Sequence, residues 1–236
     1  MTAPAAPMPD HEFESRLLAG LSYTDSRHEG MAEESASIHT LPPRQLISDT
    51  GNDGEFRLLL LKQGWVMRFL LLPDGRRQIL KFLIPGDFLN IYRLTSARRA
   101  SPLKTVTECT LAEYAGPTAS HLLQSDPSLI PGLLEYHLSE CSFLEARLAD
   151  LGRRLAEEKI ARLVLELHQR LQARGLAGSE AFNFPLTQEH LADALGMTSV
   201  HVGRTIRTLR NNGILKIERG MVRIANKPRL AAMAGL

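Results

Sequence analysis

Lys and Arg side chains gather in the C-terminal fifth of the chain, where they can bind the phosphates or base edges of a nucleic acid. Residues 187–236 hold eight basic side chains against three acids, Glu189, Asp193 and Glu218. This segment therefore carries a formal charge of +5, and because the whole chain carries +2, the other 186 residues together carry −3. A small basic segment on a slightly acidic protein is typical of a DNA-binding appendage, although charge alone also fits a solvated basic face.

The spacing of capping and turn residues in this segment predicts two short helices joined by a tight turn. Thr187 and Thr198 are placed to cap the two helices, and Gly196 between them tolerates the positive φ of such a turn. Apolar side chains recur on one face of each helix: Leu191, Ala192, Leu195, Val202, Ile206 and Leu209. Residues 214–224 then alternate in polarity and turn at Arg219-Gly220, which predicts a two-stranded wing.

The second helix turns its other face outward, and that face carries polar and basic side chains: Ser199, His201, Arg204, Thr205 and Arg207. Arg204 is the first candidate for reading sequence, because an arginine can pair with O6 and N7 of guanine in the major groove. Contacts to bases are expected from four residues: Ser199, Val200, His201 and Arg204. Contacts to phosphates are expected from six: Thr187, Thr198, Arg207, Arg210, Lys216 and Arg219. A merely structural helical hairpin would not require this basic face.

A heptad pattern after residue 126 predicts a long helix that can pair two chains and so hold their two basic surfaces at a fixed separation. The side chains that form its seam and the expected dimer interface are Leu134, His137, Cys141, Leu144, Leu148, Leu151 and Leu155. Such a narrow seam needs a partner helix, and the same helix of a second chain gives a parallel homodimer with twofold symmetry. The competing interpretation is a helix that packs on its own domain. His137 and Cys141 fit as semi-polar packing residues, with a pH or redox sensor as the alternative.

The remaining pattern places a β-domain before this helix and a helical domain after it. Short apolar runs between residues 57 and 115, with a turn at Pro73-Asp74-Gly75, predict the strands of a β-barrel or roll. Gly152 is expected to break or bend the long helix, and a second amphipathic helix follows and ends near Gly175. We therefore predict an α+β fold of five segments: an N-terminal tail (1–38), a β-roll (39–125), a dimerisation helix (126–154), a winged helix-turn-helix domain (155–229) and a C-terminal tail (230–236).

Composition and motifs exclude several classes of protein. With 44% hydrophobic and 23% charged residues, the chain is neither wholly disordered nor embedded in a membrane. Its apolar runs are too short to cross a bilayer and its N-terminus lacks a secretory signal, so a cytoplasmic location is expected. Cys109 and Cys141 are too few for a four-ligand zinc or iron-sulfur cluster within one chain. Without paired carboxylates, a Ser-His-Asp set or a phosphate loop, no enzyme is expected.

These segments resemble the cyclic-AMP receptor protein and fumarate-nitrate regulator (Crp/Fnr) family of bacterial transcription regulators, over roughly residues 40–229. The most specific likeness lies in LTQEHLADALGMTSVHVGRTIRTLRNNGIL, with LGRRLAEEKIARLVLEL at the helix junction and PGDFLN in the β-domain. The resemblance implies a jelly roll like that of cyclic-nucleotide-binding domains, which senses an effector, and a winged helix-turn-helix that binds a palindromic promoter site as a dimer. It leaves RNA polymerase open as a further partner.

The chain departs from this family where the nucleotide-binding members hold their ligand. Those members follow the GDF segment with a glycine and a glutamate that holds the ribose, whereas this chain has Asn90 and Ile91. Arg98 and Arg99 lie near the place of the phosphate-binding arginine and are the candidate effector residues, or else solvated loop arginines. A cyclic nucleotide is therefore not expected. An iron-sulfur cluster is not expected either, because the chain has only two cysteines. Haem is left open, and the effector stays unknown.

The DNA-reading helix also matches the family only in part. Its Val202-Gly203-Arg204 agrees with the family pattern, so the resemblance implies the guanine contact for Arg204. Ser199-Val200 stands where the cyclic-AMP receptor protein has Arg-Glu, so the operator sequence stays open. Two alternatives remain at this point. One is a cyclic-nucleotide-binding signalling module whose C-terminal domain contacts protein rather than DNA, and the other is an enzyme with an effector-like β-barrel.

Overall fold

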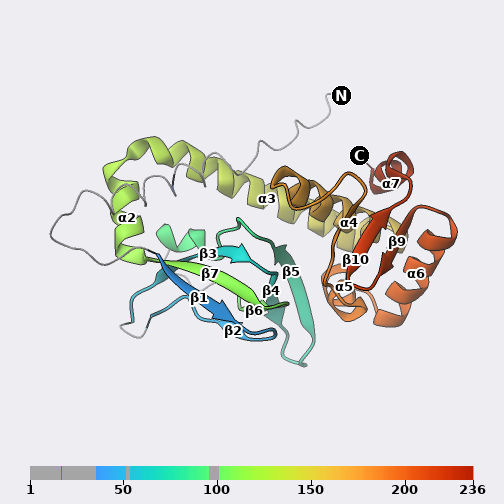
Figure 1. Ribbon diagram of the computed structural model, residues 1–236, viewed down its shortest axis with the longest axis horizontal. Coiled ribbons are helices and arrows are strands. Elements are labelled where there is room, and N and C mark those ends of the chain that lie inside the picture. Colours follow the sequence, from blue (N-terminus) through green and yellow to red (C-terminus); the bar gives the residue numbers. More distant parts are fainter. Residues whose placement is uncertain (1–16, 18–35, 52–53, 96–100, 236) are drawn as a thin grey trace.

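The computed structural model describes Leu17 and residues 36–51, 54–95 and 101–235. A β-roll and a smaller helical domain lie at opposite ends of the longest axis, and a long helix runs over the roll toward the smaller domain (Figure 1). The predicted α+β fold is confirmed, with a roll, a long helix and a winged helix-turn-helix in the expected order.

Two antiparallel sheets form the roll. The first has the order β1 (Ser37–Leu41), β7 (Cys109–Ala115), β3 (Arg57–Gln63). The second has the order β2 (Leu46–Ile47), β6 (Leu103–Thr105), β4 (Val66–Leu71), β5 (Arg77–Leu83). Alternate apolar side chains from both sheets and from the turn after β5 form one core: Leu59, Leu61, Val66, Leu83, Leu89, Leu103, Cys109 and Leu111.

The predicted hairpin joins β4 to β5, with Val66 opposite Leu83 at one end and Leu71 opposite Arg77 at the other, and the register shifts between Arg68 and Phe69. Gly75 has φ +85°, as the turn requires. Three helical segments close the other face of the first sheet: η1 (Ile91–Leu94), α2 (Gly116–Ser125) and η2 (Pro127–Leu129).

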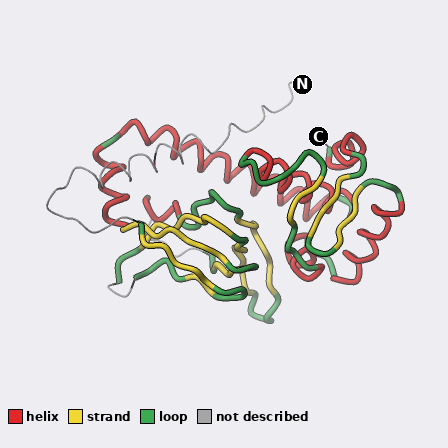
Figure 2. The backbone as a smooth tube through the Cα atoms, in the orientation of Figure 1, coloured by secondary structure: helices red, strands yellow, loops and turns green. Residues whose placement is uncertain are grey.

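The long helix α3 (Ile130–Arg153) passes over the roll and leads to α4 (Ala156–Ala173) (Figure 1). The smaller domain then continues with β8 (Ala181–Asn183), α5 (Gln188–Leu195), α6 (Ser199–Asn211), β9 (Leu215–Glu218), β10 (Met221–Ile224) and α7 (Lys227–Ala234). Its helices surround a three-stranded sheet of order β8-β10-β9 (Figure 2).

The structure corrects two expectations about where elements begin and end. Helix α3 continues through Gly152, and the break falls at Arg154 and Leu155, both of which have extended backbone. Residues 230–235, expected as a tail, lie in α7 or directly after it, and Leu230 is buried. The segment between α4 and α5 contains the short strand β8, which pairs with β10.

The roll packs directly on the smaller domain. Roll side chains such as Trp65, Phe82 and Ile84 belong to the same buried core as the helices α4, α5 and α6. The rings of Trp65 and Phe184 meet edge to face with centroids 6.4 Å apart. The winged helix-turn-helix domain is therefore packed against the roll and is not joined to it by the long helix alone.

Candidate nucleic-acid interface

Helix α6 begins at the predicted residue. Thr198 Oγ1 accepts a hydrogen bond from the backbone N–H of His201 at 3.2 Å, and Thr187 Oγ1 caps α5 through the N–H of His190 at 3.2 Å. Gly196 ends α5 with φ +62° and makes the tight turn that brings the two helices together. Both predicted caps and the glycine turn are confirmed.

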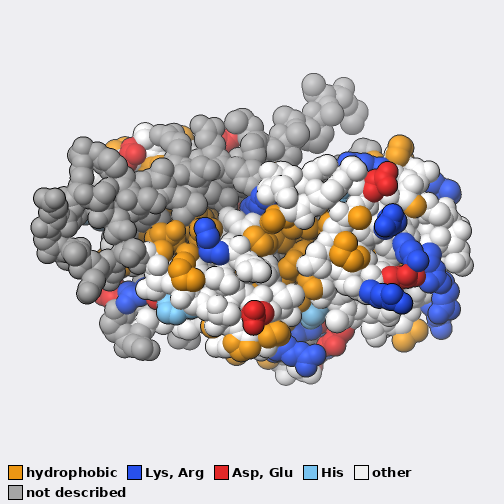
Figure 3. Space-filling model, viewed as in Figure 1, with side chains coloured by type: hydrophobic (Ala, Val, Ile, Leu, Met, Phe, Trp, Pro, Cys, Tyr) orange, Lys and Arg blue, Asp and Glu red, His pale blue; other side chains and the backbone are white. Residues whose placement is uncertain are grey.

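The reading face of α6 is open to solvent. All four residues predicted to contact bases are exposed: Ser199, Val200, His201 and Arg204. Val200 is the clearest case, because this apolar side chain is 62% exposed to solvent. On the opposite face Val202 and Leu209 are fully buried, as predicted. Lys and Arg side chains gather at this end of the molecule, over α6 and the wing (Figure 3).

Thr205 does not belong to this face. Its side chain is only 5% exposed, and its hydroxyl donates to the carbonyl of His201 at 2.9 Å. The expectation that Thr205 faces outward is therefore wrong. The reason is the pitch of the helix, which places residue 205 three positions after Val202 and so on the buried side.

The predicted wing is present, and it carries a charge cluster that the sequence did not reveal. Arg219 and Gly220 both have positive φ, +50° and +74°, which gives the tight hairpin turn between β9 and β10. Glu218 lies 2.8 Å from Lys216 Nζ and 3.6 Å from Arg210 Nη1. A hydrogen bond from Lys216 lowers the pKa of Glu218, so this carboxylate partly neutralises two of the expected phosphate contacts.

A second pairing that sequence reasoning missed lies on α5. Arg77 of β5 places Nη2 2.6 Å from Asp193 and 3.5 Å from Glu189. The roll thus neutralises two of the three acids in the DNA-binding segment. The one available signal was the pair of acids at i and i+4, which share a face of a short helix and invite a cation.

The seam on α3 is exposed in the single chain, although most of its side chains are apolar. Leu134 is 60% exposed and Leu148 is 70% exposed, while the side of the helix that packs on its own chain is formed by other residues: Leu133, Tyr136, Arg147 and Asp150. His137 and Leu151 are half-buried, and Cys141 and Leu144 are exposed. Leu155 is also exposed but stands in the extended link after α3, so it does not continue the helical seam.

The sensor region offers no group for a ribose at the expected place. Asn90 is fully buried, its Oδ1 accepts from the N–H of Leu59 at 2.9 Å, and its Nδ2 donates to the carbonyl of Arg57 at 2.7 Å. Ile91 is buried in the apolar core. The residues present do not fit a cyclic nucleotide held through its ribose. The candidate effector residues Arg98 and Arg99 lie outside the described part of the chain.

Charged side chains occupy the space between the roll and α3. Glu140 of α3 accepts from Lys81 of β5 and lies 3.6 Å from Arg68 Nη1 on β4. Arg68 also donates to the carbonyl of Leu89 at 2.9 Å and lies over the ring of Tyr92. The chain's own ion pairs thus fill the region beside the Asn90 segment.

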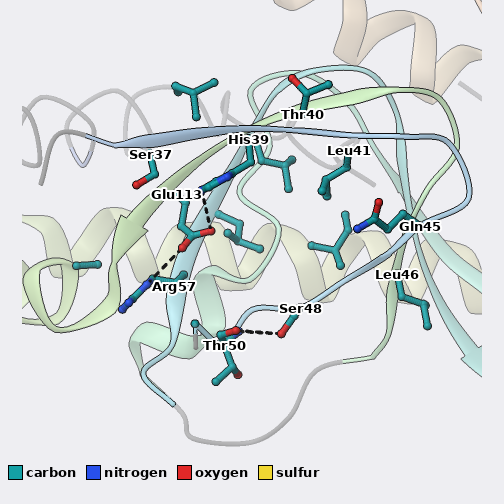
Figure 4. Close-up of a pocket in the computed structure, with 16 residues that line it drawn as sticks. Ser37, His39, Thr40, Leu41, Gln45, Leu46, Ser48, Thr50, Arg57 and Glu113 are labelled. Atoms are coloured by element: carbon teal, nitrogen blue, oxygen red, sulfur yellow. Dashed lines mark hydrogen bonds and ion pairs between the residues drawn. The ribbon is translucent and has the colours of Figure 1, made fainter. Parts of the chain in front are cut away.

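An open cavity of about 820 Å³ lies between β1 and the segment from Gln45 to Gly51 (Figure 4). His39 and Arg57 both point toward Glu113, at 3.7 and 3.3 Å. Glu113 thus forms an ion pair with Arg57 at the wall of this cavity.

Within the described residues, no cluster of His, Cys, Asp and Glu forms a set of metal ligands. Cys109 is buried at the start of β7 and Cys141 is exposed on α3. No helix in the described part of the chain is both long enough and apolar enough to span a membrane.

Comparison with known proteins defines the class of protein. Residues 38–126 match the cyclic nucleotide-binding domain model, and residues 158–233 match the Crp-like helix-turn-helix domain model. The chain belongs to the Crp/Fnr family of transcription regulators. It is a DNA-binding regulator with a sensing domain, and a signalling module that contacts protein in place of DNA is not favoured. The family consists of transcription regulators rather than enzymes.

Curated relatives extend over most of the chain. The nitrogen fixation regulation protein FixK of Bradyrhizobium diazoefficiens is 32% identical over 172 residues, covering 73% of this chain and 71% of the relative. The transcriptional activatory protein AadR of Rhodopseudomonas palustris is 30% identical over 213 residues, covering 88% and 84%. The solved structure of FixK2 from Bradyrhizobium japonicum has a TM-score of 0.74 at 23% identity, covering 85% of this chain and 98% of that one. At that identity the structural likeness shows the fold alone.

Proposed function

We propose that this protein binds a palindromic promoter site as a homodimer, with one α6 helix in each of two successive major grooves, about 34 Å apart. The observation that carries the proposal is the exposed face from Ser199 to Arg204, which begins at a capped helix end and has no partner within the described chain. An N-terminal turn of this kind can enter the major groove and present its first residues to base edges.

Roles follow from where each side chain lies. Arg204 reads guanine, Val200 contacts a thymine methyl group, and Ser199 and His201 contact neighbouring base edges. Phosphates are held by Thr187, Thr198, Arg207, Arg210, Lys216 and Arg219. The exposed leucines of α3 pair with the same helix of a second chain, which supplies the twofold symmetry that a palindrome needs.

The protein acts in the cytoplasm, without a cyclic nucleotide or iron-sulfur cluster and without an enzymatic reaction of its own. RNA polymerase is the partner through which such a regulator acts on transcription.

Selection from a random pool of duplex DNA tests the function. The expected product is an inverted repeat whose half-site centres lie about 10 base pairs apart, one helical turn. Recovery of unselected sequences, or of a single half-site without its inverted copy, contradicts the proposal.

A further inference from the structure

A buried ion cluster joins the roll to the DNA-binding domain. Asp87, in the turn after β5, accepts from Arg170 Nη2 at 2.6 Å and from Arg174 Nη2 at 2.7 Å. Arg170 lies in the last turn of α4, and Arg174 is the residue that directly follows this helix. Each arginine also donates to a carbonyl of the roll: Arg170 to Phe82 at 3.0 Å and Arg174 to Pro85 at 2.8 Å. Arg174 Nη1 also donates to the carbonyl of Ile84 at 3.4 Å, so five hydrogen bonds from these two arginines cross between the two domains.

This cluster stays charged throughout the physiological range. Burial by itself would raise the pKa of Asp87, but the guanidinium groups of Arg170 and Arg174, with Lys81 and the N–H of Ile84, lower it to about 2. Gly86 packs closely against Arg174, because a Cβ at this position would lie 3.2 Å from the Arg174 guanidinium, and its φ of +96° also favours glycine.

Backbone hydrogen bonds in both directions join the turn to strand β3 of the roll. The N–H of Gly86 donates to the carbonyl of Leu61 at 2.7 Å, and the N–H of Leu61 donates to the carbonyl of Asp87 at 3.0 Å. The same segment ends at Asn90, whose side-chain amide forms hydrogen bonds with the backbone of β3. The orientation of α4 is therefore tied to the roll core and to the Asn90 segment.

A second contact holds α5. Beside the Arg77 ion pairs, Gln78 Nε2 donates to the carbonyl of Ala194 at 3.3 Å. Neither contact uses a residue of the reading face, and that face remains exposed. The contacts between the domains thus fix the orientation of α6 relative to the roll and leave its reading face uncovered.

We propose that Asp87, Arg170 and Arg174 form an interdomain clasp that positions the DNA-binding domain on the roll and so sets the separation of the two α6 helices in the dimer. The proposal rests on the proposed function. When one α6 has bound its half-site, the second binds intramolecularly, and its effective concentration depends on how well its position matches the other half-site. A loose domain samples many positions and lowers that concentration.

The test compares two DNAs, a full palindrome and a single half-site, with the same full-length dimer. Arg174→Gln removes one of the two guanidinium groups that pair with Asp87. Arg170 still pairs with this carboxylate, so it is not left without a cation. We expect its affinity for the palindrome to fall on the order of tenfold and its affinity for the half-site to stay unchanged. Arg174→Lys keeps a cation for Asp87 and should show a smaller loss, again confined to the palindrome. Lys62→Gln removes the same charge from an exposed position on β3 and should change neither affinity.

Equal losses on both DNAs would mean that the DNA-binding domain itself is damaged, and unchanged binding to both would mean that Arg174 has no positioning role. Either result overturns the clasp. If the wild-type protein prefers neither DNA to random sequence, it is the proposed function that fails.

Discussion

Thr198 Oγ1 lies 3.2 Å from the backbone nitrogen of His201, and this cap fixes the residue at which α6 begins. Because the helix starts at Ser199, its first two turns hold Ser199, Val200 and Arg204 on the exposed side. The free N–H groups at the same helix end also favour a phosphate nearby. One threonine thus sets both the register of the reading face and part of its attraction for DNA.

Arg204→Ala should weaken binding to the specific site by roughly 1–3 kcal/mol and leave binding to random duplex DNA nearly unchanged. The reason is that a bidentate contact to guanine is lost while the phosphate contacts remain. Fluorescence anisotropy with both DNAs at the same salt concentration measures the difference. If both affinities fall equally, Arg204 contacts a phosphate.

The Glu218 cluster predicts two opposite changes in salt dependence. Lys216→Gln should weaken binding to every sequence and reduce the slope of log K against log salt by about 1, because one phosphate contact is lost. Glu218→Gln should strengthen binding to every sequence and steepen the slope, because Arg210 and Lys216 lose the carboxylate that they share. Titrations between about 50 and 200 mM salt give both slopes. Identical slopes in the wild type and both variants would mean that this cluster does not contact DNA.

The DNA-reading surface could be predicted from sequence in unusual detail, because it depends on local rules. Caps at Thr187 and Thr198 and a left-handed turn at Gly196 are decided by residues within a few positions of one another. The wing turn is equally local. Thr205 is polar, but it lies three positions after Val202 and four before Leu209, so the helix angle places it on the buried side whatever its polarity.

Leu148→Glu should convert the dimer into a monomer while the single chain keeps its fold. Leu148 is 70% exposed in one chain, so glutamate there disturbs little, but at a helix seam it places two like charges in an apolar contact. Ser142→Glu adds the same charge at an exposed position outside the heptad seam and should remain dimeric. Sedimentation equilibrium reports the mass of each. A dimeric Leu148→Glu protein would mean that α3 pairs through another face or not at all.

His190 gives the DNA-binding domain a pH dependence. Burial, followed by the charge of Arg77, lowers the pKa of His190 below its usual 6.5, and its Nδ1 accepts from the N–H of Thr187 at 3.3 Å, which requires a neutral ring. A depressed pKa contributes stability that is present above about pH 6.5 and is lost as the pH falls through the pKa of the folded protein. Wild-type protein should therefore lose more unfolding free energy between about pH 7.5 and 5.5 than His190→Gln does. The exposed His121→Gln control should follow the wild type, and an equal loss in all three would exclude His190 as the source.

The contacts between domains could not be predicted from sequence. Asp87 and Arg174 are 87 positions apart, and no periodicity relates them. The available signal was partial, namely a Pro-Gly-Asp turn and two arginines four residues apart at the C-terminal end of α4. The helix break shows the same limit, because glycine propensity favoured Gly152, whereas the chain bends at Arg154 and Leu155. There Arg154 Nη1 donates to the carbonyl of Ala234 at 3.2 Å, and Glu158 accepts from the N–H of Leu155 at 2.9 Å, so one tertiary contact and one capping contact hold the chain at the break.

Hydroxyl-radical footprinting of the selected DNA, with full-length protein, tests the central claim most directly. The account predicts two protected patches on one face of the duplex, centred about 10 base pairs apart and related by twofold symmetry, both lost together in the Leu148→Glu protein. A single protected patch, or protection that is uniform along the DNA, would contradict it.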